Sequence, residues 1–442
     1  MWEKLRSIWT VPDLRKKILF TLGMLLVFRI LAHIQVPLTA AEYKSLQALD
    51  ANSSSGVGQL LGLLDVFSGG SLQTFSIVSF SVYPYITATI VMQLLQPIIP
   101  ALQNLSTQGE AGRLRFSQIT RIIAVPLAFL QALGQCALFQ QQGVLTNFSL
   151  IDPAYALQTF AILASLVAGT MILVWLGELI TEKGIGNGIS IIILANILSN
   201  LPKYVSQGVT AAQSGGSTAV VSIGVFILVG IITIIGIIYI YLGQRRVPVQ
   251  YPTKRSVGRG MLVGSAQTTY IPMQINSAGM IPLIFASSML LFPTVIVQYL
   301  STNSTPWVSA TALWIATNVI NTSDWWYWAM NFLLVVAFTY FYAYVLWQQQ
   351  NIPENLQKQG AFIPGYRPGE PTSKYLFTIL NRITLAGALF LGVITVLPFI
   401  ARVGGSQMLG AASLLIAVGV VLDTVRQLES QMVMRNYSGF LS

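Results

Sequence analysis

The sequence has almost none of the residues on which most metalloproteins and nucleophilic enzymes depend. Its 442 residues include one cysteine and one histidine, Cys136 and His33. One cysteine cannot form a disulfide within the chain, and the two residues together offer too few ligands for a Cys–His zinc site. A Ser-His-Asp catalytic set is disfavoured as well. We therefore expect no metal, no cofactor and no enzymatic activity.

Charge is also scarce. Charged residues make up 9% of the chain and hydrophobic residues 54%, whereas soluble domains carry roughly 25% charge. Several apolar runs reach the ~20 residues that cross a ~30 Å hydrocarbon core. The pattern predicts an all-α polytopic membrane protein with ten mostly helical spans. These are 18–37, 73–95, 117–139, 156–180, 188–202, 219–242, 276–299, 328–347, 383–400 and 407–425.

Lysine and arginine are concentrated on one side of the predicted spans. Only Lys44, Lys203 and Arg402 fall in segments on the opposite side. Arg29 lies within the first span, and the rest of the 24 basic residues share one side. Cytoplasmic loops carry an excess of Lys and Arg, so both termini are expected in the cytoplasm. An even number of spans requires the same result.

We expect two pseudo-symmetric halves of five helices. Span two carries Pro84 and Pro97, and span seven carries Pro282 and Pro293. This loose repeat is typical of transporters and channels built from internal repeats. The expected organisation is a cytoplasmic amphipathic lead-in at 1–17, a first half at 18–202, an external loop at 203–218, a second half at 219–425 with cytoplasmic loops 243–270 and 348–376, and a cytoplasmic tail at 426–442.

The stretch from Gly243 to Pro293 joins a basic hairpin to a broken helix. Asn276, Gly279 and Pro282 interrupt its apolar segment. Irregular backbone at membrane depth is tolerated only where it is buried in protein or lines a water-filled cavity. The stretch therefore indicates a pathway beside a charged docking surface. The basic residues of the hairpin are Arg245, Arg246, Lys254, Arg255 and Arg259.

Two shorter segments allow more than one interpretation. The apolar run Leu60–Phe67 is too short to span a bilayer. A re-entrant helix that fills a lumen and a surface helix on the outer leaflet fit it equally well. The GIGNG turn at 184–188 is similar to part of a phosphate-binding glycine loop, but it follows a predicted membrane helix rather than a strand. A tight turn in which Asn187 caps the next helix is favoured.

Seven motifs are spread over nearly the whole chain. They are GLLDVFSGG (62–70), PYITATIVMQLLQP (84–97), GEAGRLRFSQITR (109–121), TEKGIGNGISIIIL (181–194), GQRR (243–246), NSAGMIPLIFASSMLLFP (276–293) and AFIPGYRPGEPTSKYL (361–376). In content and in order these motifs resemble the SecY family, the channel subunits of bacterial-type Sec protein translocons. The substrate class, an unfolded polypeptide, is implied by this resemblance and not by composition or spacing.

The resemblance implies a central hourglass pore, closed at its waist by a ring of apolar side chains and below it by a plug at 60–70. An apolar constriction excludes ions because it does not replace their hydration shell. Val82 is smaller than the isoleucine usual in the family, so the ring is expected to be slightly looser there. The implied ring is Val82, Ile86, Ile189, Ile193, Ile284 and Ile416, and the implied plug residues are Leu63, Leu64, Asp65 and Phe67.

The resemblance also implies a lateral gate between spans two and seven, with Gln93 and Asn276 as polar contacts across it. Transmembrane segments would leave through this gate into the lipid bilayer. The basic hairpin and Arg367 in the second cytoplasmic loop would dock the ribosome or the SecA ATPase. The other implied partners are the small membrane subunits SecE and SecG, signal peptides and nascent chains. The expected location is the plasma (inner) membrane, or also a thylakoid membrane in a cell that has one.

Two other classes of protein compete with this interpretation. A secondary transporter also uses broken helices, but it usually places ionisable residues at mid-membrane for coupling. Here we assign only Arg29 and Asp423 to span interiors. An intramembrane enzyme would need paired aspartates within its spans or a histidine for a zinc or serine mechanism. Proton-coupled uptake would favour the transporter, and conductance triggered by a signal sequence would favour the translocon.

Overall fold

The structure is a computed structural model of the full chain. It describes residues 11–49, 68–72, 74–141, 143–145, 148, 152–214, 216–257, 261–279, 281–301, 306–318, 324–400 and 411–438. The expected plug residues Leu63, Leu64, Asp65 and Phe67 lie outside the described residues, as do Arg259 and most of the lead-in.

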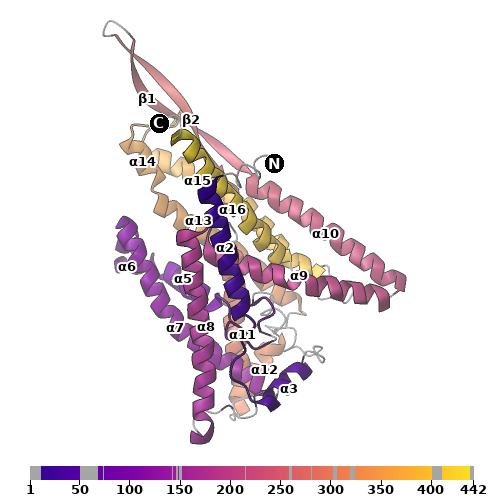
Figure 1. The fold of residues 1–442 in the computed structure, drawn as a ribbon. Helices are drawn as coiled ribbons and strands as arrows, with labels where there is room; N and C mark the ends of the chain where they lie inside the picture. The colour runs from indigo at the N-terminus through magenta and orange to yellow at the C-terminus, as the bar shows by residue number, and fades with distance from the viewer. Residues whose placement is uncertain are drawn as a thin grey trace.

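The described part of the chain is mostly helical (Figure 1). Its first half contains α2 (Pro12–Leu31), α3 (Ala40–Leu49), α5 (Tyr83–Leu95), α6 (Pro100–Thr107), α7 (Gly109–Gln141), α8 (Pro153–Lys183) and α9 (Gly188–Ser214). Its second half contains α10 (Gly216–Leu242), α11 (Ile281–Ser301), α12 (Pro306–Asn318), α13 (Trp325–Gln350), α14 (Ile352–Lys358), α15 (Glu370–Ile400) and α16 (Ala411–Ser438).

One antiparallel hairpin interrupts the helices, so the expectation of an all-α fold is wrong in this detail. Strands β1 (Gln244–Val257) and β2 (Met261–Gln274) pair from Gln244 opposite Gln274 to Val257 opposite Met261. The sequence explains the strand, because Val247 and Val249 alternate with polar or proline neighbours and are both buried. Figure 1 shows the hairpin projecting beyond the helices at one end of the molecule.

The helix of expected span five runs past Pro202, although its apolar part is Gly188–Pro202 as expected. Helix α9 continues through Pro202 to Ser214, so most of the expected external loop at 203–218 is helical. Proline removes one backbone donor and disfavours the helix interior in water. In a membrane protein, neighbouring helices and polar side chains satisfy the freed carbonyl, and an interior proline is tolerated. Pro126 in α7 and Pro293 in α11 are interior prolines of the same kind.

Four helices in the described residues are long and apolar enough to cross a membrane. They are Gly109–Ala137, Tyr155–Lys183, Trp325–Lys358 and Glu370–Leu397, with shorter apolar helices at Gly188–Pro202 and Gly230–Leu242. The full set of ten spans stays a prediction.

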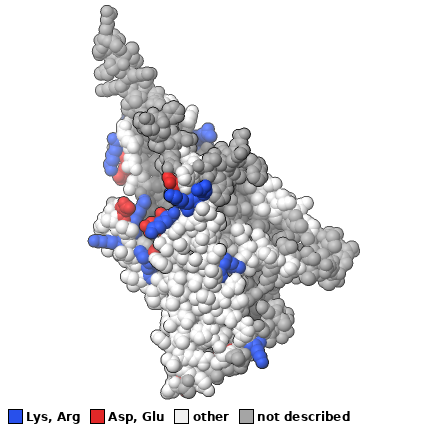
Figure 2. All heavy atoms as spheres, in the orientation of Figure 1, with Lys and Arg blue, Asp and Glu red and all other residues white. Residues whose placement is uncertain are grey.

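The charged side chains gather toward the end of the molecule that carries the hairpin. Figure 2 shows blue and red atoms mainly over this end of the visible face, whereas the opposite end is almost entirely uncharged. The start of α2 and the end of α16 also lie at the hairpin end (Figure 1). There the Lys17 amine donates a hydrogen bond of 3.4 Å to Gln431 Oε1. The described charged side chains, the start of α2 and the end of α16 thus lie toward the same end of the molecule.

Candidate functional site

The six residues of the expected ring belong to one hydrophobic cluster or pack against it. Val82, Ile193, Ile284 and Ile416 are buried members of this cluster, with exposed fractions of 1%, 4%, 8% and 1%. Ile86 and Ile189 are partly buried and pack against it. The ring residues come from α5 or its N-cap, α9, α11 and α16, which lie far apart in the sequence. The structure thus places four of the expected ring residues in one hydrophobic cluster and the other two against it, and the ring itself stays a prediction.

The ring encloses very little empty space. A cavity of about 10 Å³ is lined by Ser81, Val82, Tyr83, Ile86, Ile193, Ile284 and Ser287. A cavity needs roughly 10–15 Å³ to hold one water molecule. An ion with its hydration shell therefore finds no room here, and the apolar lining offers no substitute ligands. Val82, Ile86, Ile193 and Ile284 thus leave almost no open space between them.

The local sequence explains how Val82 at the start of α5 comes to lie beside Ile193 of α9. Pro84 stands in the first turn of α5, where its missing N–H costs nothing, and Val82 is the N-cap. Ser81 just before it has a left-handed backbone, with φ of 51°. The Asn196 side chain of α9 donates a 2.8 Å hydrogen bond to the Ser81 hydroxyl. Helix α9 therefore holds the start of α5 beside its own ring residue Ile193.

The turn between α8 and α9 sets the position of Ile189. A Cβ atom added at Gly188 would lie 1.9 Å from the Gly177 carbonyl oxygen, so only glycine permits this crossing. Thr181 Oγ1 donates to the Gly177 carbonyl and accepts from the Gly188 N–H at 2.8 Å. Asn187 Oδ1 accepts from the Ile189 and Ser190 amides, as expected for a helix cap.

Helices α5 and α11, the expected gate, contact each other. The structure does not bring Gln93 and Asn276 into a hydrogen bond, because Gln93 Oε1 and Asn276 Oδ1 both lack a partner among the described residues. Asn276 instead donates to the Gly279 carbonyl at 3.1 Å within the broken segment before α11.

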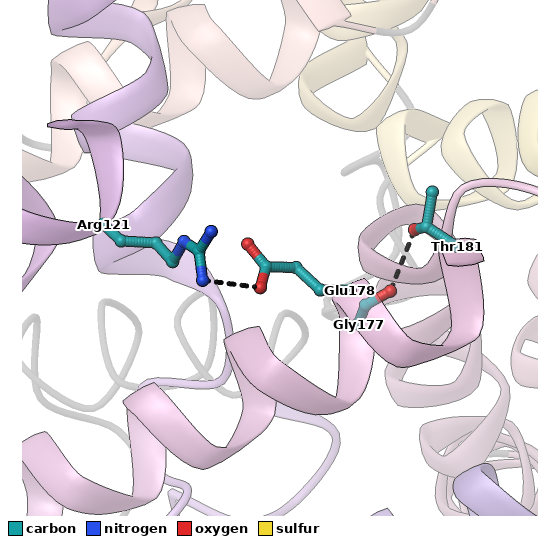
Figure 3. Close-up of polar contacts among 4 residues, drawn as sticks. All are labelled: Arg121, Gly177, Glu178 and Thr181. Atoms are coloured by element: carbon teal, nitrogen blue, oxygen red, sulfur yellow. Dashed lines mark hydrogen bonds and ion pairs between the residues drawn. The ribbon is translucent and has the colours of Figure 1, made fainter. Parts of the chain in front are cut away.

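An ion pair between α7 and α8 is a feature that sequence reasoning missed. Arg121 Nη1 lies 3.2 Å from Glu178 Oε2, and Figure 3 shows the two side chains pointing toward each other from neighbouring helices. The two residues lie near the ends of the predicted spans 117–139 and 156–180, outside the span interiors. Opposite charges near the ends of two adjacent spans were the sequence feature that could have revealed the pair, since ionisable groups in membranes usually pair with one another.

The two other charged residues within spans also have partners. Arg29 donates to the Gly69 carbonyl at 3.3 Å. Asp423 hydrogen-bonds the Tyr241 hydroxyl, and Arg426 donates to the Tyr241 carbonyl at 2.9 Å. These contacts join separate segments of the chain. Arg29 and Asp423 are the residues that a coupled transporter would use, and here each has a structural partner.

The two loops expected in the cytoplasm contact each other and form one unit. Gln250 in β1 and Phe362 exchange two backbone hydrogen bonds of 2.9 and 3.0 Å. A shared hydrophobic cluster lies beneath them, and it includes Val247, Val249, Ala361, Ile363 and Leu376. The expected docking residues Arg245 and Arg246 are exposed on β1, at the foot of the hairpin. The side chains of Lys254 and Arg255 are not among those described.

Arg367 is exposed at a rigid bend of the second loop. Gly365 and Gly369 on either side have φ of 88° and 106°. Thr372 Oγ1 donates to the Arg367 carbonyl at 2.7 Å, and the Tyr366 and Tyr375 rings stack with centroids 4.0 Å apart. In the next turn, the hydrogen bond from Lys374 lowers the pKa of Glu370. The backbone is thus held while the guanidinium faces solvent.

Comparisons with known proteins agree with this geometry. A family model of SecY matches residues 76–425. The chain is 41% identical to the protein translocase subunit SecY of Bacillus subtilis over 100% of both chains. It is 40% identical to that of Streptomyces coelicolor over 97% of both chains.

The fold of the chain is similar to that of solved protein-conducting channels. A structure described as a protein-conducting channel has a TM-score of 0.61 at 16% identity, over 97% of both chains. A SecY protein whose plug domain stabilises the closed state has a TM-score of 0.59 at 18% identity, over 97% of both chains. The chain therefore has the fold of the protein-conducting channels, and it is a multi-pass membrane protein. It belongs to the SecY family.

Proposed function

We propose that this chain is a protein-conducting channel that moves unfolded polypeptides across the membrane and releases transmembrane segments sideways into the bilayer. The observation that carries the proposal is a cavity of only about 10 Å³ at which expected ring residues of α5, α9 and α11 meet, while Ile416 of α16 belongs to the same hydrophobic cluster. A soft ring of branched apolar side chains can seal the resting channel against ions and can also fit around a passing chain of any sequence.

The proposal includes ten transmembrane helices in two halves around an hourglass pore, with both termini in the cytoplasm. It is supported by the distribution of Lys and Arg, and by the contact of Lys17 near the start of α2 with Gln431 near the end of α16. The segment at 60–70 is the plug. Helices α5 and α11 are the lateral gate, and Gln93 and Asn276 are polar groups that a signal peptide meets when they part.

We assign partner docking to the unit formed by the hairpin and the second loop. Its exposed arginines suit carboxylate or phosphate groups, which a guanidinium binds in bidentate geometry. The SecA ATPase and the ribosome both offer such groups. SecE and SecG are the proposed membrane subunits, in the plasma membrane and in a thylakoid membrane where one is present. A canine Sec61 in a ribosome–channel complex has a TM-score of 0.54 to this chain, which supports the same fold for a ribosome-bound channel.

Transport into vesicles tests the proposal. Vesicles that contain the chain with SecE and SecG should protect an unfolded, signal-bearing precursor from external protease when SecA and ATP are added. A precursor without its signal sequence is the matched control. Proton-coupled uptake of a small solute, without protection of the precursor, would favour the secondary transporter instead.

A further inference from the structure

The ion pair between α7 and α8 is made through a single contact. Arg121 Nη1 and Glu178 Oε2 lie 3.2 Å apart, and their side chains are 39% and 28% exposed. Arg121 Nε and Glu178 Oε1 have no partner among the described residues. Figure 3 shows the two side chains reaching toward each other across the space between the helices. The pair therefore joins α7 to α8 without the two parallel bonds that an arginine and a carboxylate can form.

Helix α5 reaches the same point through Tyr85. The Tyr85 side chain hydrogen-bonds Ser117 of α7, and it lies close enough to Arg121 and Glu178 to feel both charges. Ser117 and Arg121 are four residues apart, which places them on one face of α7. The next residue after Tyr85 is Ile86, which lines the cavity of about 10 Å³. The turn of α5 that carries an expected ring residue is thus held where α7 and α8 are joined.

The neighbour of Glu178 in α8 holds α9. A Cβ atom added at Gly177 would lie 3.0 Å from Ile189 Cγ1, and one added at Gly188 would lie 1.9 Å from the Gly177 carbonyl oxygen. Thr181, one turn further along α8, bonds both the Gly177 carbonyl and the Gly188 N–H (Figure 3). The crossing of α8 and α9 therefore has no slack, and a shift of α8 carries the start of α9 with it.

These contacts connect the two sides of the expected ring. Ile189 and Ile193 are four residues apart on one face of α9, and Ile193 lines the same cavity as Ile86 of α5. From Ile86 the connection runs through Tyr85 to the ion pair, and from the ion pair through Gly177 to α9. A change at the ion pair therefore alters how α5 and α9 face each other.

We propose that Arg121 and Glu178 are positioning residues for the ring: their ion pair holds Ile86 of α5 and Ile189 of α9 in the arrangement that keeps the constriction closed to ions. The inference rests on the proposed function, which assigns these isoleucines to the seal. The pair thereby sets how much the resting channel leaks and how strong a signal sequence must be to open it.

Resting ion leakage per folded channel tests the role of the pair. Iodide influx is measured in vesicles of phosphatidylethanolamine and phosphatidylglycerol that contain the chain with SecE and SecG and no precursor. Arg121→Gln and Glu178→Gln should each raise influx about two- to fivefold, the range expected when a half-exposed ion pair is lost. Glu354→Gln is the matched control and should leave influx unchanged, because it removes an ion pair with Lys358 that lies within one helix.

Two double variants separate the pairing from the individual side chains. Arg121→Gln/Glu178→Gln should leak no more than either single variant, because the same pair is lost only once. Arg121→Glu/Glu178→Arg restores opposite charges at the two positions and should return influx to within about twofold of the unmodified channel. The single variants, unlike the swapped one, should also export a precursor whose weakened signal sequence the unmodified channel rejects.

A purely structural role would lower the amount of folded channel and leave influx per channel unchanged. That result for both single variants would overturn the positioning role. A swapped variant that leaks as much as the single variants would overturn it too, because the pairing would then not matter.

The variant Ile284→Asn separates this inference from the ring assignment on which it rests. If Ile284→Asn leaves influx unchanged, the ring assignment fails and the positioning role fails with it. If Ile284→Asn raises influx while the variants of the pair do not, the ring stands and the positioning role alone is wrong.

Discussion

At the scale of the residue, the proposed closed state depends on apolar side chains. Such side chains neither hydrogen-bond water nor replace the hydration shell of an ion. Ile284 and Ile416 are buried in the ring cluster with exposed fractions of 8% and 1%. An amide in either position would offer a hydrogen-bonding partner to water inside the constriction. The ring is therefore the place where a single polar atom should have the largest effect on the seal.

We predict that Ile284→Asn or Ile416→Asn makes the constriction easier to wet. Resting conductance should rise about tenfold, equivalent to roughly 1.4 kcal/mol in the opening equilibrium. Export of precursors with weakened signal sequences should improve as well. Ile235→Asn on α10, where the isoleucine is 61% exposed, is the control. Wild-type conductance and stringency in both ring variants would show that these residues do not form the seal.

Arg367 is the residue on which the docking proposal depends most. Arg367→Glu should abolish most SecA-driven transport while the channel still folds and inserts, because the side chain is exposed in a loop held by backbone contacts. Arg367→Lys should recover only part of the activity, since an ammonium lacks the bidentate geometry of a guanidinium. Lys358→Glu reverses another exposed charge in the same region and should have little effect. The measurements are precursor transport and SecA binding with equal amounts of each variant, and normal transport by Arg367→Glu would refute the assignment.

Individual residues show what the sequence could and could not predict. The cap by Asn187 was predictable because it depends on neighbours in the sequence. The ring residues were indicated only by the family motifs, since an isoleucine in an apolar helix carries no sign of which way it faces, and their role stays a prediction. Hydrogen bonds from Arg29 and Ser199 to Gly69 link residues 40 and 130 positions apart, and no local pattern encodes them.

At the scale of the element, the proposed gate requires α5 and α11 to separate. Ile86 of α5 and Ser287 of α11 line the same cavity in the closed structure. A short reagent that joins cysteines at these two positions should therefore stop the helices from parting. Tying them would prevent insertion of a signal helix between them.

We predict that the double variant Ile86→Cys/Ser287→Cys loses transport of precursor after treatment with a short thiol–thiol cross-linker. Cleavage of a reducible cross-linker should restore transport. The native Cys136 is buried, so each single variant under the same treatment serves as the control. Undiminished transport by a fully cross-linked channel would mean that α5 and α11 are not the gate.

The elements themselves were predicted unevenly. The basic hairpin before a broken helix was expected from residues 243–282, and the structure has it as β1, β2 and the irregular turn before α11. The helix of span five continues past its expected end at Pro202, because a proline that breaks helices in water is tolerated inside a membrane protein. The pairing of Gln250 with Phe362 was not predictable, because it joins two loops more than 100 positions apart.

At the scale of the whole molecule, the account requires ten spans with both ends in the cytoplasm. Reporters fused after Ser106, Val257 and Gln359 should all give a cytoplasmic reading, because the basic loops of the chain cluster on that side. Fusions after Lys44 and after Trp325 are the external controls. An external reading after any of the first three positions would overturn the assignment of spans.

The central claim is that the chain forms a channel that is closed at rest and opened by a signal sequence. It is tested most directly by recording single-channel currents in a planar bilayer that contains the chain with SecE and SecG. The account predicts almost no current at rest, because the closed ring leaves a cavity of only about 10 Å³. It predicts discrete openings when a functional signal peptide is added, and none with a peptide whose apolar core is interrupted by charge. Openings that ignore the peptide, or a bilayer that stays silent with the functional peptide, would contradict the claim.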